Sequence, residues 1–214
     1  MEKTLSFIHR YEPSVRESAP TLLLLHGTGG NESDLLPLGR MIAPGAALLS
    51  PRGKVLENGM PRFFRRLTEG VFDEDDLRRR ANELADFIAE ARDQYSLPAP
   101  IAVGYSNGAN IAAAVLLLRP EALAGVVLLR SMMPLRAAPA VNLQGKPVLL
   151  LSGVMDPIAA ADTTARLASA LDAAGATVLQ RELPAGHELS QADIAAARGW
   201  LASAARHEPE TAIA

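Results

Sequence analysis

The sequence predicts an α/β fold with a mostly parallel central sheet and helices on both faces. Short apolar runs bounded by glycine, proline or polar residues are typical of parallel strands that are buried on both faces. Helical patterns separate these runs, which implies crossover connections between parallel strands. The chain has 214 residues, 49% hydrophobic and 21% charged, so it holds enough apolar side chains for one packed core. We therefore expect residues 1–214 to form a single domain.

Six apolar runs fit strands and four patterns fit helices. Leu77, Ala81, Leu84, Ile88 and Ala91 recur every three or four residues, which places them on one helical face. A second pattern is apolar all round, as in a helix buried against a sheet. The expected strands are 21–25, 46–50, 100–103, 125–129, 147–151 and 177–182, and the expected helices are 73–95, the all-apolar 107–118, 162–173 and 191–205.

The segments outside these strands and helices also allow predictions. Residues 4–11 alternate weakly and predict an antiparallel edge strand, so that 1–20 hold this strand and its connection. Residues 51–71 show no clear element, and a loop of that length is a candidate wall of a binding site. Ser190 and Asp193 stand at capping-box spacing before the last helix. Residues 206–214 are expected to form a frayed tail.

Composition and charge exclude several classes of partner. A formal net charge of −3 gives no concentrated positive surface for nucleic acid. The basic cluster at 62–80 is interleaved with acidic residues, as in a solvated, salt-bridged segment. The absence of cysteine excludes disulfides and thiolate nucleophiles. No leader pattern and no run of about 18 apolar residues is present, so we expect a cytoplasmic protein without stable membrane association.

A candidate nucleophile lies where the strand ending at 103 meets the buried helix. Gly104, Ser106 and Gly108 form the pattern G-x-S-x-G, which holds a serine on a strained turn at the edge of the sheet. The two glycines allow the strand and the helix to approach closely. Between a strand and a helix, this pattern favours a catalytic Ser106 over a structural turn serine.

A serine hydroxyl needs a base within hydrogen-bond reach. The chain has four histidines. We expect His9 and His207 to be exposed, and His26 to shape the glycine-rich loop that follows it. His187 remains as the candidate base, because it lies in a loop after the last strand, from which it can reach the carboxyl edge of the sheet.

The base in turn needs a carboxylate to orient it. Asp156 follows the strand 147–151 and gives the chain order Ser, Asp, His that α/β hydrolases use. Its alternative role is that of a turn aspartate before proline. Asp162 is held in reserve as the acid, although its place at a helix start is typical of a capping residue.

Two backbone amides are candidates for stabilising the negative charge that develops on a substrate carbonyl oxygen. The amide of Asn107 follows the candidate nucleophile at a helix N-terminus, and the amide of Thr28 lies in the glycine-rich loop. Phosphate binding by this loop is disfavoured, because Glu32 stands where a dinucleotide fingerprint has glycine and no Walker lysine follows.

Together, these motifs resemble the phospholipase/carboxylesterase group of α/β hydrolases, which includes acyl-protein-thioesterase-like enzymes. The resemblance extends over about residues 22–201, and the stretch 62–73 resembles a bacterial subgroup of small esterase-like hydrolases. The strings that carry it are Leu25-His26-Gly27-Thr28-Gly29-Gly30, Ser50-Pro51-Arg52-Gly53, Gly104-Tyr105-Ser106-Asn107-Gly108, Asp156-Pro157 and Gly186-His187.

The resemblance implies an α/β-hydrolase fold without a lid domain, a Ser106, Asp156 and His187 triad, and an oxyanion hole from Thr28 and Asn107. It implies no cofactor and no metal, and it allows a homodimer. The expected activity is that of a carboxylesterase on small-molecule esters, through an acyl-enzyme on Ser106. A thioesterase or lysophospholipase on the same triad and a non-catalytic small-molecule receptor are the alternatives.

A small core with an open cleft favours short acyl groups. Methionine and aromatic side chains make adaptable apolar walls for such a cleft, although core packing explains them equally well. The candidates are Phe63, Phe64, Met132, Met133 and Met155. Bacterial relatives often carry histidine or glycine after the strand that follows the nucleophile helix, whereas this chain has Arg130. The role of Arg130 and the charge of the pocket are therefore open at this point.

Overall fold

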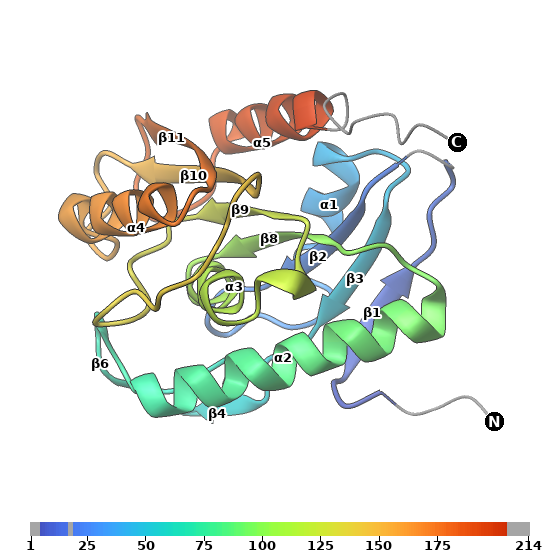
Figure 1. Cartoon of the computed structure of the whole chain (residues 1–214), viewed down its shortest axis with the longest axis horizontal. Helices are drawn as coiled ribbons and strands as arrows, with labels where there is room; N and C mark the ends of the chain where they lie inside the picture. The colour runs from blue at the N-terminus through green and yellow to red at the C-terminus, as the bar shows by residue number, and fades with distance from the viewer. Residues whose placement is uncertain (1–4, 17–18, 205–214) are drawn as a thin grey trace.

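The computed structural model describes residues 5–16 and 19–204 (Figure 1). Its main sheet has seven strands in the order β1-β3-β2-β8-β9-β10-β11. The first strand in this order pairs antiparallel with its neighbour, and all other neighbours pair parallel. The predicted α/β class with a mostly parallel sheet is therefore confirmed.

The six strands predicted from apolar runs and the four predicted helices are present, with bounds that shift by at most two residues. The sheet strands are β1 (His9–Glu12), β2 (Thr21–Leu25), β3 (Ala47–Pro51), β8 (Ile101–Tyr105), β9 (Gly125–Leu129), β10 (Pro147–Gly153) and β11 (Thr177–Leu183). The helices are α1 (Leu36–Ile42), α2 (Glu74–Tyr95), α3 (Asn107–Leu118), α4 (Ala161–Ala173) and α5 (Gln191–Ala204), with a short 3-10 helix η1 (Pro120–Ala122).

Helices cover both faces of the sheet, and alternate strand residues pack into two separate cores. In β2, Leu23 and Leu25 face the core that contains α2, α3 and α4, whereas Leu22 and Leu24 face the core that contains α1 and α5. Figure 1 shows these two helical layers on opposite sides of the sheet. Burial on both faces explains why the strands read as continuous apolar runs rather than as alternating ones.

The predicted antiparallel edge strand is confirmed, but two details of the chain differ from the predictions. The strand β1 covers His9–Glu12, so it begins later than the expected 4–11 and ends one residue beyond it. The segment 51–71 holds two small hairpins, β4 (Val55–Glu57) with β5 (Met60–Arg62), and β6 (Arg66–Thr68) with β7 (Val71–Phe72). The first hairpin turns at Asn58 and Gly59, which both have positive φ angles, 52° and 80°. Asn-Gly is the strongest short hairpin signal, so this element was readable from the sequence.

Two side chains that we expected at the surface are at least partly buried. The side chain of Arg62 is 3% exposed, so the basic cluster at 62–80 is not a solvated segment throughout. His9 is half-buried, and its Nε2 lies 2.8 Å from the Tyr95 hydroxyl. His207 and the expected tail at 206–214 lie outside the described residues. None of the helices in the described ranges is long and apolar enough to span a membrane.

Glycine permits very close backbone contacts where α3 meets the sheet. A Cβ atom on Gly108 would lie 1.9 Å from the carbonyl oxygen of Leu25, and one on Gly104 would lie 2.4 Å from the carbonyl oxygen of Gly108. Neither neighbour is a flexible side chain that could move away. The pattern G-x-S-x-G is therefore a packing requirement of the strand, the turn and the helix together.

We expect Gly108→Ala to destabilise the protein by about 3 kcal/mol or more, because the added methyl group collides with backbone atoms. Gly199→Ala in α5 is the matched control, since no atom lies within 4 Å of an added Cβ there. It should stabilise the protein by about 0.5–1 kcal/mol, the usual gain for alanine over glycine within a helix. Urea unfolding of both variants measures these changes, and an equal effect of the two would contradict the packing argument.

Candidate active site

The turn that carries Ser106 connects β8 to α3. The backbone of Ser106 has φ 53° and ψ −113°, a conformation that a non-glycine residue adopts only under strain. Its N–H donates to the carbonyl oxygen of Leu129 at 2.8 Å, which ties the turn to the end of β9. The hydrogen bond to Leu129 thus helps to maintain the strained conformation, which keeps Ser106 at the carboxyl edge of the sheet.

Three predicted residues from three loops meet at this edge. His187 Nε2 lies 2.9 Å from Ser106 Oγ, and His187 Nδ1 lies 2.9 and 3.0 Å from the two carboxylate oxygens of Asp156. Ser106 follows β8, Asp156 follows β10 and His187 follows β11. Since parallel strands end at one edge, the chain order places these side chains in one hydrogen-bonded line.

The Asp156 carboxylate is buried but well supplied with donors. Its Oδ1 accepts the N–H groups of Ile158 at 2.8 Å and Ala159 at 3.0 Å. Burial by itself would raise the pKa of Asp156, but these amides and His187 outweigh burial and hold the pKa below its usual value. Asp156 is therefore a carboxylate at neutral pH.

An ionised carboxylate can only accept, so the proton on the neutral imidazole sits on Nδ1. Nε2 of His187 is then free to accept the hydroxyl proton of Ser106. This arrangement gives the serine a base and gives the base a fixed tautomer, which is the requirement for a serine nucleophile.

Three side-chain donors, two from Arg130 and one from Tyr105, bind the backbone of the His187 loop. Arg130 Nε donates to the carbonyl oxygen of Gly186 at 2.8 Å, and Arg130 Nη2 donates to that of Glu188 at 3.1 Å. The Tyr105 hydroxyl donates to the carbonyl oxygen of His187 itself at 3.1 Å. Three consecutive carbonyl groups, those of Gly186, His187 and Glu188, are thus held by side-chain donors, which fixes the backbone that carries the imidazole.

Arg130 is itself fixed by a buried ion pair with Asp193 in the first turn of α5. Its Nη1 and Nη2 lie 2.7 and 2.9 Å from the two carboxylate oxygens, and both side chains are at most 1% exposed. Arg130 therefore contributes no charge to an open pocket, which resolves the question left by the sequence. No local pattern signals this pair, because its members are 63 residues apart.

Asp193 also closes the predicted capping box. Its carboxylate accepts the N–H of Ser190 at 2.8 Å and the Ser190 hydroxyl at 2.7 Å. Burial would raise the pKa of Asp193, but the hydrogen bonds from Arg130 and Ser190 lower it below its usual value. Asp193 thus caps α5 through Ser190 and also fixes Arg130, which holds the His187 loop.

The two candidate oxyanion donors are the amide of Thr28, in the loop after β2, and the amide of Asn107, the first residue of α3. In the described part of the chain neither backbone amide donates a hydrogen bond to the protein, so both are free for a ligand. Thr28 belongs to the loop that His26 shapes. The His26 Nδ1 donates to the carbonyl oxygen of Gly27 at 2.7 Å, and its Nε2 accepts the N–H of Gly53 at 3.0 Å. Burial lowers the pKa of His26, which keeps this ring neutral.

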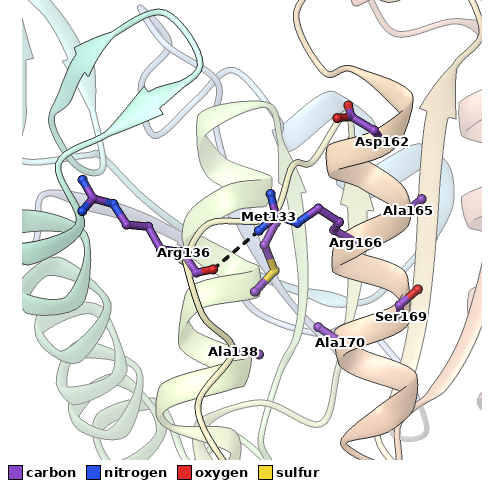
Figure 2. A pocket seen from close by; sticks show the side chains of 8 residues that line it. All are labelled: Met133, Arg136, Ala138, Asp162, Ala165, Arg166, Ser169 and Ala170. Carbon is purple, nitrogen blue, oxygen red and sulfur yellow. Dashed lines mark hydrogen bonds between the residues drawn. The ribbon is translucent and has the colours of Figure 1, made fainter.

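The five predicted wall residues do not form one cleft. Phe63 and Phe64 are 2% and 0% exposed and belong to the core, and Met132 is also buried. Met155 is 67% exposed, next to Asp156. Met133 lines an open pocket of about 500 Å³ between the loop after β9 and α4 (Figure 2). The residues that line this pocket are Met133, Arg136, Ala138, Asp162, Ala165, Arg166, Ser169 and Ala170. Ser106, Asp156 and His187 are not among them.

The chemistry available at the site is that of a nucleophile, a base and backbone donors. Across residues 5–16 and 19–204, no group of three histidine, aspartate or glutamate side chains is placed to hold a metal ion.

The chain is similar in sequence to a known family and to a known protein. The sequence model described as the α/β hydrolase fold matches residues 56–213. "Putative hydrolase MhqD" of Bacillus subtilis (strain 168) is 48% identical over 198 residues, which cover 92% of this chain and 98% of MhqD.

Solved structures of two carboxylesterases are also similar. The Bacillus cereus carboxylesterase has a TM-score of 0.90 and 45% identity, with 93% of this chain and 95% of that chain covered. The Mesorhizobium loti carboxylesterase has a TM-score of 0.88 and 34% identity, with 92% and 95% covered.

The lowered pKa of Asp193 predicts a pH-dependent part of the stability. An aspartate in the unfolded chain titrates near pH 4, above the folded-state pKa of Asp193. The contribution of the ion pair is therefore complete above the unfolded pKa and is lost as the pH falls through the folded pKa. Asp193→Asn should cost about 3–5 kcal/mol near neutral pH, because it leaves the Arg130 charge buried without a partner. The deficit should shrink below about pH 4.

Urea unfolding at a series of pH values, followed by circular dichroism, measures this difference in free energy. Asp172→Asn on the exposed side of α4 is the matched control and should stay near the wild type throughout. If the loss in the free energy of unfolding of Asp193→Asn stayed constant from about pH 6 to about pH 3, the pKa of Asp193 would not be lowered by folding, and this prediction would be wrong.

Proposed function

Because this chain belongs to the α/β-hydrolase family and is an enzyme, we propose that it is a serine carboxylesterase with Ser106 as its nucleophile. The observation that carries the proposal is the line of hydrogen bonds from Ser106 Oγ through the His187 ring to Asp156, 2.9 Å on each side of the ring. A small-molecule receptor would need neither this line nor the strained turn that presents the serine.

The first half of the reaction forms an acyl-enzyme. Ser106 Oγ attacks the carbonyl carbon of the ester as its proton passes to His187 Nε2, and the electron pair of the C=O bond moves onto the carbonyl oxygen. When the tetrahedral intermediate collapses, the C–O bond to the alcohol breaks, and the alcohol takes the proton from Nε2. The acyl group is then esterified to Ser106.

The second half returns the enzyme to its starting state. Water gives a proton to His187 Nε2 and attacks the acyl carbon, and the bond to Ser106 Oγ then breaks with return of that proton to the serine. Asp156 holds the Nδ1–H tautomer and stabilises the imidazolium that forms in each half. Its lowered pKa supports this role, since the group must stay ionised.

The free amides of Thr28 and Asn107 are the proposed donors to the oxyanion. They require no rearrangement of side chains, and the Asn107 amide lies at the N-terminus of α3, where the helix dipole favours negative charge. Backbone donors placed in advance of the reaction are the largest single source of rate enhancement in many acyl-transfer enzymes.

We propose small esters with short acyl chains as substrates. The carboxylesterases from Bacillus cereus and Mesorhizobium loti support the ester class. Phe63 and Phe64, the two aromatic candidates for the wall of the cleft, are packed in the core, so they offer no apolar surface to a long acyl chain. The pocket at Met133 does not include any of the three residues that we assign to the triad.

Ser106→Ala should lower kcat on p-nitrophenyl butyrate by about a thousandfold or more, because the acyl-enzyme cannot form. Ser169→Ala, an exposed serine of α4 (Figure 2), is the control and should keep the wild-type rate. Steady-state release of p-nitrophenol from purified proteins measures both. Equal rates for Ser106→Ala and the wild type would remove the serine mechanism.

The acyl-chain preference gives a second test. The wild type should have a higher kcat/KM on p-nitrophenyl acetate and butyrate than on the octanoate, since Phe63, Phe64 and Met132 are buried and cannot contact a long acyl chain. A parallel series of acyl thioesters compares oxygen and sulfur leaving groups on the same triad. A higher kcat/KM on the octanoate would contradict the short-chain proposal, and preference for the thioesters would make the enzyme a thioesterase.

A further inference from the structure

Three consecutive residues at the end of β5 contact both halves of the proposed oxyanion hole. The carbonyl oxygen of Pro61 accepts the N–H of Gly29 at 2.9 Å. Arg62 Nη1 donates to the hydroxyl oxygen of Thr28 at 3.0 Å. The N–H of Phe63 donates to Asn107 Oδ1 at 2.8 Å. The mechanism above uses none of these contacts.

Arg62 is the part of this segment that reaches Thr28 through a side chain. It is 3% exposed, and its Nη1 also lies 3.1 Å from Glu57 Oε2 across the β4–β5 hairpin. Its Nε donates to the carbonyl oxygen of Phe64 at 3.2 Å. Glu57 is in turn held by Arg66 at 2.7 Å. The guanidinium is therefore fixed on several sides, and one of its donors ends on the oxyanion loop.

Backbone packing joins the same segments a second time. A Cβ atom on Gly53 would lie 2.3 Å from the carbonyl carbon of Arg62 and 2.7 Å from the Phe63 nitrogen. The N–H of Gly53 donates to His26, which begins the oxyanion loop. The contacts of Gly53 already fix the distance between the Arg62 backbone and the start of the oxyanion loop. The hydrogen bond from Arg62 to Thr28 therefore affects only the local conformation of the loop at Thr28.

We propose that Arg62 is a positioning residue for the oxyanion hole: by holding the Thr28 hydroxyl, it sets the direction in which the Thr28 amide points. This inference rests on the proposed function. Thr28 itself is exposed, and its side chain is held by the hydrogen bond from Arg62. Misdirection of one oxyanion donor is costly, because the donor must meet the charge that develops in the transition state and not the ground-state carbonyl.

A purely structural role for Arg62 makes a different prediction. If Arg62 only stabilised the hairpin, its loss would lower thermal stability while leaving kcat of the folded protein unchanged. If it positions the Thr28 amide, kcat falls with little change in KM, because the amide acts mainly on the transition state.

Thr28→Val is the first test, because valine keeps the shape and the backbone amide but removes the oxygen that Arg62 holds. On p-nitrophenyl butyrate we expect kcat to fall roughly 10- to 100-fold, with KM within about twofold of the wild type. Thr28→Ser keeps the hydroxyl and should restore most of the rate. Arg62→Gln should give the same loss as Thr28→Val, and the double variant should be no slower than either single variant, since both remove one hydrogen bond.

The second measurement uses phenylboronic acid, which forms a tetrahedral adduct with a serine nucleophile and mimics the transition state. Its inhibition constant should rise in Thr28→Val and Arg62→Gln by the same factor as kcat/KM falls. Arg66→Gln is the matched control, because it weakens the ion pair to Glu57 without touching Thr28. It should lower the melting temperature and leave kcat near the wild-type value.

The inference is overturned if Thr28→Val keeps the wild-type kcat, or if Arg66→Gln slows the reaction as much as Arg62→Gln does. These outcomes leave the serine mechanism intact as long as Ser106→Ala remains inactive. An active Ser106→Ala would overturn the proposed function first. Thr28→Val keeps the test decisive even where Arg62→Gln fails to fold.

Discussion

The backbone contact between α3 and the sheet is the constraint on which the rest of the site depends. Gly108 lies so close to the end of β2 that no side chain fits there, and Gly104 lies equally close to the first turn of α3. These contacts join backbone to backbone, so they leave little freedom in the relative position of β2, β8 and α3. Ser106, the Asn107 amide and the start of the Thr28 loop are consequently parts of one rigid unit.

The loop that carries His187 is not part of that unit and needs its own support. A loop exposes carbonyl groups that must find donors, and one guanidinium supplies several in a fixed plane. Arg130 uses this property to hold the residues on both sides of His187, and it stands directly after Leu129, which accepts the N–H of Ser106. The end of β9 therefore holds both Ser106 and the loop of His187 in place.

Both arginine-centred networks place a buried guanidinium beside an acidic partner, which is buried in the case of Asp193 and 26% exposed in the case of Glu57. An ion pair with a buried member gives little net stability, because desolvation of the charge offsets the attraction. Arg130 with Asp193 and Arg62 with Glu57 are thus better understood by what their remaining donors hold: carbonyl groups of the His187 loop in the first case and the Thr28 hydroxyl in the second. In each pair the carboxylate neutralises the charge while the guanidinium fixes a loop.

The parts of this structure that the sequence predicted are those that local patterns determine. Strands such as β2 and β9 are continuous apolar runs, and the triad candidates follow from a motif and a chain order. Helix α1 was missed because it has seven residues and no side-chain cap. The contacts of Arg130 with Asp193 and of Arg62 with Thr28 could not be predicted, since they join segments 63 and 34 residues apart that only the folded chain brings together.

The separation between the open pocket and the triad follows from how the chain leaves Arg130. Ser131 and Met132 are bound to Asn110 of α3, through the Ser131 hydroxyl at 3.1 Å and the Met132 N–H at 2.9 Å. Thr164 of α4 donates to the carbonyl oxygen of Ser131 at 2.9 Å. The chain is thus anchored on two helices before it reaches Met133 in the pocket. Between the pocket residue Met133 and Arg130, the chain is therefore held by α3 and α4, which separates this wall of the pocket from the residue that supports the His187 loop.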